Sequence, residues 1–207
     1  MLSTLIYRIP AVLIAICFHE FAHGFISYKL GDPTPRRTGR LSLNPLNHLD
    51  LMGTLALLFI GFGWAKPVQV NPSYYKNKKL DMVKVALAGP IMNFFIAFIC
   101  LIIYHLQNKY LFFYGTYIDN LLIITIYINI GLGIFNLIPI PPLDGSKVLS
   151  AILPADKYFA YMRYEMYGTL IVFILLWSGL LSMPLSYMLT KTFSGMENIV
   201  VKLMGLI

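Results

Sequence analysis

The feature that most constrains this chain is a polar motif inside its first apolar segment. A mostly apolar run begins at Leu2 and leads into His-Glu-Phe-Ala-His at positions 19–23. In a helix, residues four apart lie on the same face, so the imidazoles of His19 and His23 point the same way, with Glu20 beside them. A carboxylate at mid-bilayer costs roughly 2.5 to 3.5 kcal/mol on the insertion scale, so ionisable groups in a membrane span are usually functional. The motif therefore predicts a membrane helix that carries a chemically active site.

Composition excludes a soluble fold. Of the 207 residues, 58% are hydrophobic and 12% are charged, whereas soluble domains average about 25% charged residues. No stretch is long and polar enough for a separate soluble domain, so we predict one integral-membrane domain over 1–207, with a core at 1–153 and C-terminal helices at 154–207. The net charge of +7 does not predict a nucleic-acid partner. The basic residues gather at 29–40 and 66–84 beside apolar segments, which is typical of the cytoplasmic side of a membrane protein.

The apolar segments set the expected architecture. Segments that are long or apolar enough to cross a bilayer lie at 3–30, 82–106, 121–138 and 167–181. Residues 184–207 are mixed and fit either a crossing or a surface helix. The segment from Leu51 to Gly63 is about thirteen residues long, which favours a re-entrant element over a full span. We therefore expect an all-α polytopic membrane protein with about 4–6 transmembrane helices and a small β-hairpin or re-entrant element.

The β element is expected at residues 64–72, which read Trp-Ala-Lys-Pro-Val-Gln-Val-Asn-Pro. Val68 and Val70 alternate with polar residues between two prolines. Alternation of this kind predicts a short strand, and proline confines a strand to the edge of a sheet.

Two histidines one turn apart on one face of a helix are a pattern that binds zinc. A catalytic zinc site needs three protein ligands and an open position for water. His19 and His23 would supply two, and three further side chains are candidates for the third: Asp144, then His48, then Asp32. Asp144 ranks first because it follows an apolar segment and the proline-rich run at 139–143, whose three prolines favour a rigid extended chain. We therefore expect Asp144 on a loop rather than on a helix.

A zinc site of this kind is suited to hydrolysis. The metal lowers the pKa of water to about 7, and Glu20 is placed to take the proton and to pass it to a leaving amine. Asn93 and Asn136, in otherwise apolar segments, could donate to a developing oxyanion. Each asparagine also fits a plain helix–helix hydrogen bond, and His48 fits a loop histidine bonded to the backbone.

Three motifs, in this order, resemble the site-2 protease family of intramembrane zinc metalloproteases, which is peptidase family M50. They are the His-Glu-Phe-Ala-His stretch at 19–23, the Gly-Pro-Ile-Met-Asn stretch at 89–93, and the stretch from Asn136 to Leu143-Asp144-Gly145. The resemblance covers roughly residues 10–150 and is similar to the small bacterial or archaeal branch that lacks a PDZ domain.

The resemblance implies a site and a reaction. The implied ligands of one zinc ion are His19, His23 and Asp144, with Glu20 as the catalytic base. Asn93 and Asn136 are implied to bind substrate or to stabilise charge. The implied reaction is cleavage of transmembrane or signal-anchor segments of membrane proteins, near the cytoplasmic side of a prokaryotic plasma membrane.

A strand-like segment would help such a reaction. A helical substrate hides its scissile carbonyl in its own hydrogen bonds, and adding the unwound chain to an open edge would replace those bonds. Residues 64–72 resemble the region thought to clamp substrate in the family, so we expect Val68, Gln69 and Val70 to offer that edge. His48 has a tentative role on the substrate side.

Two other classes of protein fit part of the pattern. A membrane metal-ion transporter also places histidine and aspartate inside the bilayer, and an inactive scaffold could bind membrane peptides. Glu20 favours the enzyme, because peptide hydrolysis needs a base beside the metal ligands whereas transport does not. The expected partners are a membrane-protein substrate and the lipid bilayer, and the sequence indicates no oligomeric state.

Overall fold

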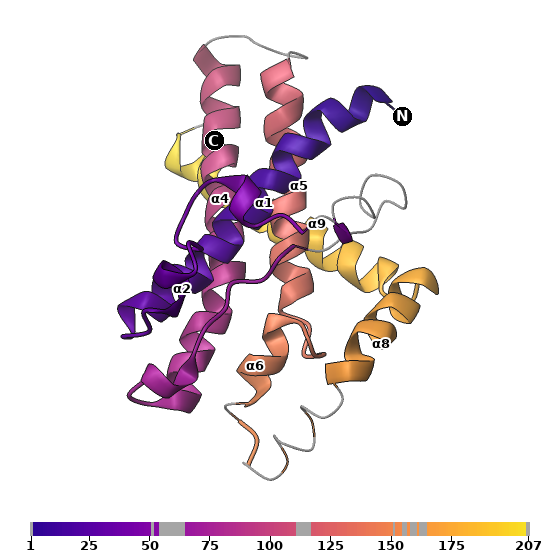
Figure 1. Ribbon diagram of the computed structural model, residues 1–207. Helices are drawn as coiled ribbons and strands as arrows, with labels where there is room; N and C mark the ends of the chain where they lie inside the picture. The colour runs from indigo at the N-terminus through magenta and orange to yellow at the C-terminus, as the bar shows by residue number, and fades with distance from the viewer. Residues whose placement is uncertain are drawn as a thin grey trace.

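The chain folds into a bundle of long helices with shorter helices packed around it (Figure 1). The computed structural model describes residues 2–50, 52–53, 65–110, 117–150, 152–154, 157, 161 and 165–205. Three long helices form the centre: α1 (Leu2–Lys29), α4 (Lys78–Tyr110) and α5 (Tyr117–Asn136). The shorter elements are α2 (Thr34–Arg37), α6 (Asp144–Ser150), α8 (Glu165–Trp177), α9 (Ser182–Leu203) and the 3-10 turns η1 (Pro45–Asn47) and η2 (Pro72–Tyr74).

Three of the described helices are long and apolar enough to cross a membrane, namely those at Leu5–Lys29, Lys78–Tyr110 and Tyr117–Asn136. The expected span at 167–181 is different in the structure. Helix α8 has only 13 residues and meets α9 at an angle of 84°, with Gly179 between them at a φ of +73° that glycine adopts without strain. The described residues therefore hold three spans, which is fewer than the four to six expected, or four if α8 and α9 count as one broken span, which is the lower end of that range.

The predicted β-hairpin is wrong for the part of the chain that the structure describes. The only pairing there is an isolated antiparallel bridge between Leu49 and Ala65, and residues 66–71 are extended without a partner strand. The amide groups of this segment bond elsewhere: Lys66 N donates to His48 O, and Val68 N donates to a Glu20 carboxylate oxygen. The predicted re-entrant element at 51–63 falls almost entirely outside the described residues.

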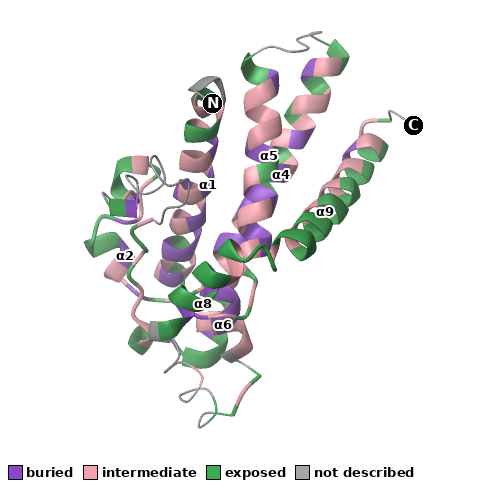
Figure 2. Cartoon of the chain, turned by 90° about the vertical axis from the view of Figure 1, so that its right-hand side faces the viewer, coloured by how far each residue is buried: buried purple, intermediate pink, exposed green. Residues whose placement is uncertain are grey.

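Close packing holds the central helices together. Helix α4 contacts both α1 and α5, and Figure 2 shows buried residues along these three helices and mostly exposed ones along α9. Where α4, α5 and α9 meet, a core cluster consists of Ala97, Leu101, Ile126, Ile130, Ile134 and Val200. Lipid tails are as apolar as these side chains, so such helices associate through close fit and polar contacts rather than through hydrophobic burial.

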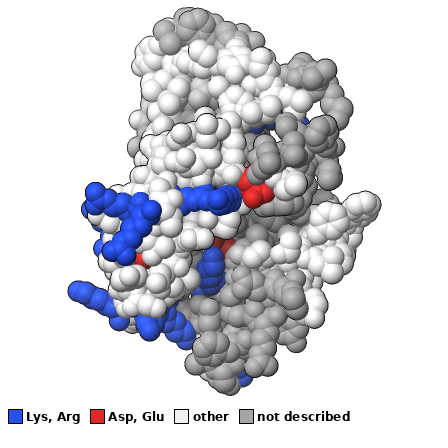
Figure 3. Space-filling view, in the orientation of Figure 1, with Lys and Arg blue, Asp and Glu red and all other residues white. Residues whose placement is uncertain are grey.

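Charge is distributed unevenly along the bundle. Figure 3 shows most Lys and Arg side chains of the visible face on its lower left, while the upper part is largely uncharged. The lower end is where α1 ends, where α2 lies and where α4 begins (Figure 1). On this face the basic side chains thus gather at the end of the bundle where α1 ends, and the His-Glu-Phe-Ala-His motif lies in the half of α1 nearer to that end.

Candidate metal centre and active site

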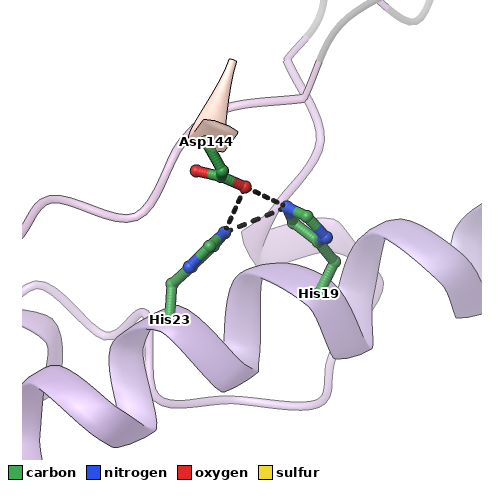
Figure 4. Close-up of side chains that lie close together, drawn as sticks. All are labelled: His19, His23 and Asp144. Carbon is green, nitrogen blue, oxygen red and sulfur yellow. Dashed lines mark hydrogen bonds and ion pairs between the residues drawn. The ribbon is translucent and has the colours of Figure 1, made fainter. Parts of the chain in front are cut away.

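Three predicted metal ligands meet in the interior of the bundle (Figure 4). Helix α1 supplies His19 and His23, which are one turn apart, and α6 supplies Asp144. The two Nε2 atoms are 3.0 Å apart, and Asp144 Oδ2 lies 3.2 Å from His19 Nε2 and 3.1 Å from His23 Nε2. All three residues are at least 92% buried.

The outer nitrogens of both imidazoles face hydrogen-bond acceptors. His19 Nδ1 lies 2.6 Å from Asn93 Oδ1, and His23 Nδ1 lies 2.7 Å from the carbonyl oxygen of Val85. In a neutral ring this places the proton on Nδ1 and leaves the lone pair of Nε2 facing inward. Two lone pairs and a carboxylate oxygen then converge on one point, an arrangement suited to a metal cation at its centre.

The spacing of these three atoms fits zinc. Bonds of about 2.1 Å in a tetrahedral site place neighbouring ligand atoms about 3.4 Å apart. The three separations measured here, 3.0, 3.1 and 3.2 Å, are shorter than that by only about 0.4 Å or less. Two imidazoles and one carboxylate also form one of the known ligand sets of catalytic zinc sites, with the fourth position left for water or substrate.

Asp144 is held by the turn that follows α5, and one prediction about it is wrong. It is the first residue of the short helix α6 rather than part of a loop. Aspartate favours helix N-termini, and here a helix begins directly after the prolines. A Cβ on the next residue, Gly145, would lie 2.6 Å from the carbonyl oxygen of Ile138. Only glycine allows the turn to pack this closely on the end of α5.

Gly89 on α4 lies directly against the two histidines of the candidate metal site. A Cβ at this position would lie 2.5 Å from His19 Cε1 and 2.7 Å from His19 Nε2, and it would also clash with His23 Nε2. Glycine is therefore required for the imidazoles to reach their places. The sequence signal was the Gly-Pro pair that begins the second motif.

Asn93 belongs to a buried chain of hydrogen bonds. Besides facing His19, its Nδ2 donates to the carbonyl oxygen of Ala15 at 3.1 Å and to Asn129 Oδ1 at 2.9 Å. Asn129 in turn donates to the carbonyl oxygen of Thr125 at 2.9 Å. Both asparagines are fully buried, which places Asn93 behind His19 and not at the surface of a substrate cavity. Asn129 was not singled out from the sequence, although an asparagine in an apolar segment was a usable signal there as it was for Asn136.

A cavity of about 150 Å³ opens beside the metal ligands. Its lining includes Glu20, Val68, Val70, Asn136 and Lys147. Val68 N donates to Glu20 Oε2 at 2.9 Å, so the extended segment bonds directly to the proposed base. Val68 and Val70 are half-buried and Gln69 is exposed, as expected for alternating side chains.

Two further contacts bear on the cavity. Asn136 donates to the carbonyl oxygen of Leu132 at 3.1 Å and also lines the cavity. Lys147 Nζ lies 3.5 Å from Asp144 Oδ1, the carboxylate oxygen that does not face the histidines. The positive charge of Lys147 beside Oδ1 favours binding of a metal through Asp144 Oδ2 alone.

The other ligand candidates lie outside the metal group of the described residues, which consists of His19, His23 and Asp144. His48 is 1% exposed, and its Nε2 lies 2.7 Å from the carbonyl oxygen of Ser42. Asp32 is fully buried and accepts hydrogen bonds from Ser27, Thr34 and Asn71. These hydrogen bonds join the two residues mainly to loops and turns rather than to the metal group.

Comparisons with known proteins agree with this geometry. The model of peptidase family M50 matches residues 113–179. YwhC of Bacillus subtilis (strain 168), named as a candidate zinc metalloprotease, is 37% identical over 178 residues, which cover 84% of this chain and 81% of that protein. Two more proteins named in the same way are Rip2 of Mycolicibacterium smegmatis, 32% identical over 79% of this chain and 64% of Rip2, and MJ0611 of Methanocaldococcus jannaschii, 29% identical over 78% and 84%. No solved structure matches the chain.

A helical membrane protein that buries two histidines and an aspartate around one point, with a glutamate beside them, belongs to the class of membrane-embedded zinc metalloproteases. The similarity to YwhC over most of both chains identifies the group within that class. The chain belongs to peptidase family M50, the site-2 protease family.

Proposed function

We propose that this protein is an intramembrane endopeptidase that cleaves transmembrane or signal-anchor segments of other membrane proteins. One observation carries the proposal: a complete set of zinc ligands lies beside Glu20 at a cavity within a bundle of apolar helices. A site at that depth is reached more easily by a segment that already lies in the bilayer than by a soluble peptide. We treat residues 1–207 as one domain that carries out this reaction.

Zinc, when bound by His19, His23 and Asp144, supplies a Lewis acid that polarises the peptide carbonyl and acidifies water. The remaining chemistry falls to Glu20. Val68 N–H holds Oε2 of the Glu20 carboxylate, and no hydrogen bond engages Oε1 among the residues described here. Glu20 Oε1 can therefore accept the proton of the attacking water and then transfer it to the departing amine.

The extended segment provides a place for an unwound substrate. Within residues 67–70, Val68 N is the one backbone group with a hydrogen bond to another described residue. The remaining amides and carbonyls are available to pair with an added strand. Replacing Gln69 by proline would remove one such amide, and we expect substrate affinity to fall. Unchanged cleavage of a membrane substrate by the Gln69→Pro variant would argue against the clamp.

Asn136 is the remaining candidate for direct contact with substrate. It lines the cavity, whereas Asn93 is buried behind His19. We propose that Asn136 donates to substrate or to the developing oxyanion, and that Asn93 orients His19. The basic residues gather at the end of the bundle nearer the site (Figure 3), and lysine and arginine mark the cytoplasmic side. Cleavage is therefore proposed to occur near the cytoplasmic face of a prokaryotic plasma membrane.

The test is cleavage of single-span membrane proteins reconstituted with the protease in the same vesicles. The Glu20→Gln variant should retain zinc, because Glu20 is not a ligand, and should lose cleavage. Glu197→Gln is the matched control, since Glu197 lies on α9 away from the cavity, and it should cleave normally. Cleavage by Glu20→Gln at the wild-type rate would remove the proposed mechanism.

A further inference from the structure

The extended segment at residues 66–71 is attached to the zinc-binding helix α1 and its C-terminal turn at two points. Near its start, Val68 N donates to Glu20 Oε2 at 2.9 Å. At its end, Asn71 N donates to Asp32 Oδ2 at 2.7 Å. Both acceptors are carboxylates, and one of them is the proposed general base.

Asp32 is the centre of a buried hydrogen-bond cluster. Its carboxylate accepts from Ser27 Oγ at 2.7 Å, from Thr34 N at 2.9 Å and from Asn71 N at 2.7 Å, and no part of the residue is exposed. Ser27 Oγ also lies 2.7 Å from Tyr75 OH. Because the single proton of Ser27 is given to Asp32, Tyr75 must donate to Ser27. The cluster thus joins α1, the turn after it and both ends of η2.

The distance between the two attachment points is nearly the same along α1 as along the extended segment. On α1, Glu20 is seven residues from Ser27, whose hydroxyl group bonds to the same Asp32 oxygen as Asn71 N, or about 10.5 Å along the helix axis. Val68 and Asn71 are three residues apart in an extended chain, or about 10 Å. Gly24 lies between the attachment points on α1, where a Cβ would meet Val68 Cγ1 at 3.3 Å. The segment therefore follows α1 in a fixed register, packed against a glycine.

We propose that Asp32 is a positioning residue for catalysis, which holds residues 67–71 in register on α1 so that Val68 N–H orients Glu20 and the open edge of the segment faces substrate. The inference rests on the proposed function, and it adds that substrate binding and orientation of the base depend on the same buried carboxylate. If the segment were displaced, its open backbone edge would no longer face the substrate, and Val68 N would no longer donate to Glu20. The metal ligands would remain, because none of them bonds to the cluster.

The experiment compares Asp32→Asn with wild type in vesicles that contain a single-span substrate cleaved by wild type. The amide of asparagine keeps the shape of the carboxylate but places a donor where an acceptor is needed. We expect kcat/KM to fall about tenfold, which corresponds to about 1.4 kcal/mol, with contributions from both kcat and KM. Zinc content should stay at one per chain.

Amide hydrogen exchange supplies a readout that does not depend on activity. In Asp32→Asn the peptide that contains residues 67–71 should exchange about tenfold faster, while peptides of α1 around His19 should not change. Asp119→Asn is the matched control, because Asp119 is also a buried aspartate, 7% exposed, but lies in the first turn of α5, which starts at the opposite end of the bundle. It should leave both the exchange of 67–71 and kcat/KM near wild type.

Ser27→Ala is a milder variant in case Asp32→Asn does not fold, since it removes one bond from the cluster and keeps the carboxylate. A shift in the same direction but of smaller size supports the inference. Wild-type kinetics and wild-type exchange of residues 67–71 in the folded variants would overturn it. Failure of the proposed function itself has a different signature, which is cleavage that persists in Glu20→Gln.

Discussion

Replacing Gly89 by alanine tests the metal centre through a residue that binds no metal. The added methyl carbon would lie 2.5 Å from His19 Cε1 and 2.7 Å from His19 Nε2. Ordinary carbon contacts are about 3.5 to 4.0 Å long, so α4 or the imidazole must move by about 1 Å. Metal sites accept deviations of about 0.2 Å in ligand distances, and a shift of this size exceeds that several-fold.

The expected magnitude follows from this displacement. Changes in residues that only hydrogen-bond to metal ligands cost about 10- to 100-fold in metal affinity. Displacing a ligand itself should cost at least the upper figure, which is about 2.8 kcal/mol. Zinc affinity is measured by competition with a chromophoric chelator, and folding of the detergent-solubilised protein is followed in parallel by circular dichroism.

Gly131→Ala is the matched control for this prediction. Gly131 lies on α5, and a Cβ there would meet only Leu189 Cδ1, at an ordinary distance of 3.7 Å. The control should bind zinc as wild type does. If Gly89→Ala bound zinc with wild-type affinity, the arrangement of the imidazoles against α4 would be wrong.

Three more predictions concern the hydrogen bond between Asn93 and His19, the choice between Asp144 and His48 as the third ligand, and the charge of Asp32. Asn93→Ala should lower zinc affinity by about 10- to 100-fold, because His19 Nδ1 loses its acceptor, and the same chelator competition measures it. Asp144→Ala should abolish stoichiometric zinc binding whereas His48→Ala should keep it, as metal analysis of the purified variants will show. The hydrogen bonds to Asp32 outweigh the effect of its burial and hold its pKa below the usual range, so it contributes stability that is present above about pH 4 and lost on further acidification. The difference in unfolding midpoint between wild type and Asp32→Asn should therefore shrink below about pH 4.

The main helices could be predicted because long apolar runs have few alternatives. The segments expected at 3–30, 82–106 and 121–138 correspond to α1, α4 and α5. Helix α4 begins earlier than expected, at Lys78, since its first turn is polar and apolar content gives no signal there. The span expected at 167–181 is a 13-residue helix that ends in a sharp bend around Gly179, and the apolar run before the bend gives no signal of it.

The strand prediction failed for an informative reason. Alternation of Val68 and Val70 with polar residues shows that one side of the segment is covered. It does not show what the backbone amides bond to. In this protein two of them bond to carboxylates of Glu20 and Asp32, so the segment is extended and covered on one side without pairing to a strand of the described residues. Only the fold reveals acceptors that are so distant in sequence.

The candidate ligands His19 and His23 could be predicted from their spacing and Asp144 only as one of three alternatives, whereas the residues that orient the histidines form a pattern that is visible only once α4 is placed against α1. Val85, Gly89 and Asn93 are each four residues apart and share one face of α4. The first accepts from His23, the second makes room for both imidazoles, and the third accepts from His19. A single face of α4 thus fixes both the tautomer and the position of two candidate ligands. The pattern is a hydrogen-bond acceptor, a glycine and a second acceptor at intervals of four residues, and it matches two histidines that lie one turn apart on the neighbouring helix.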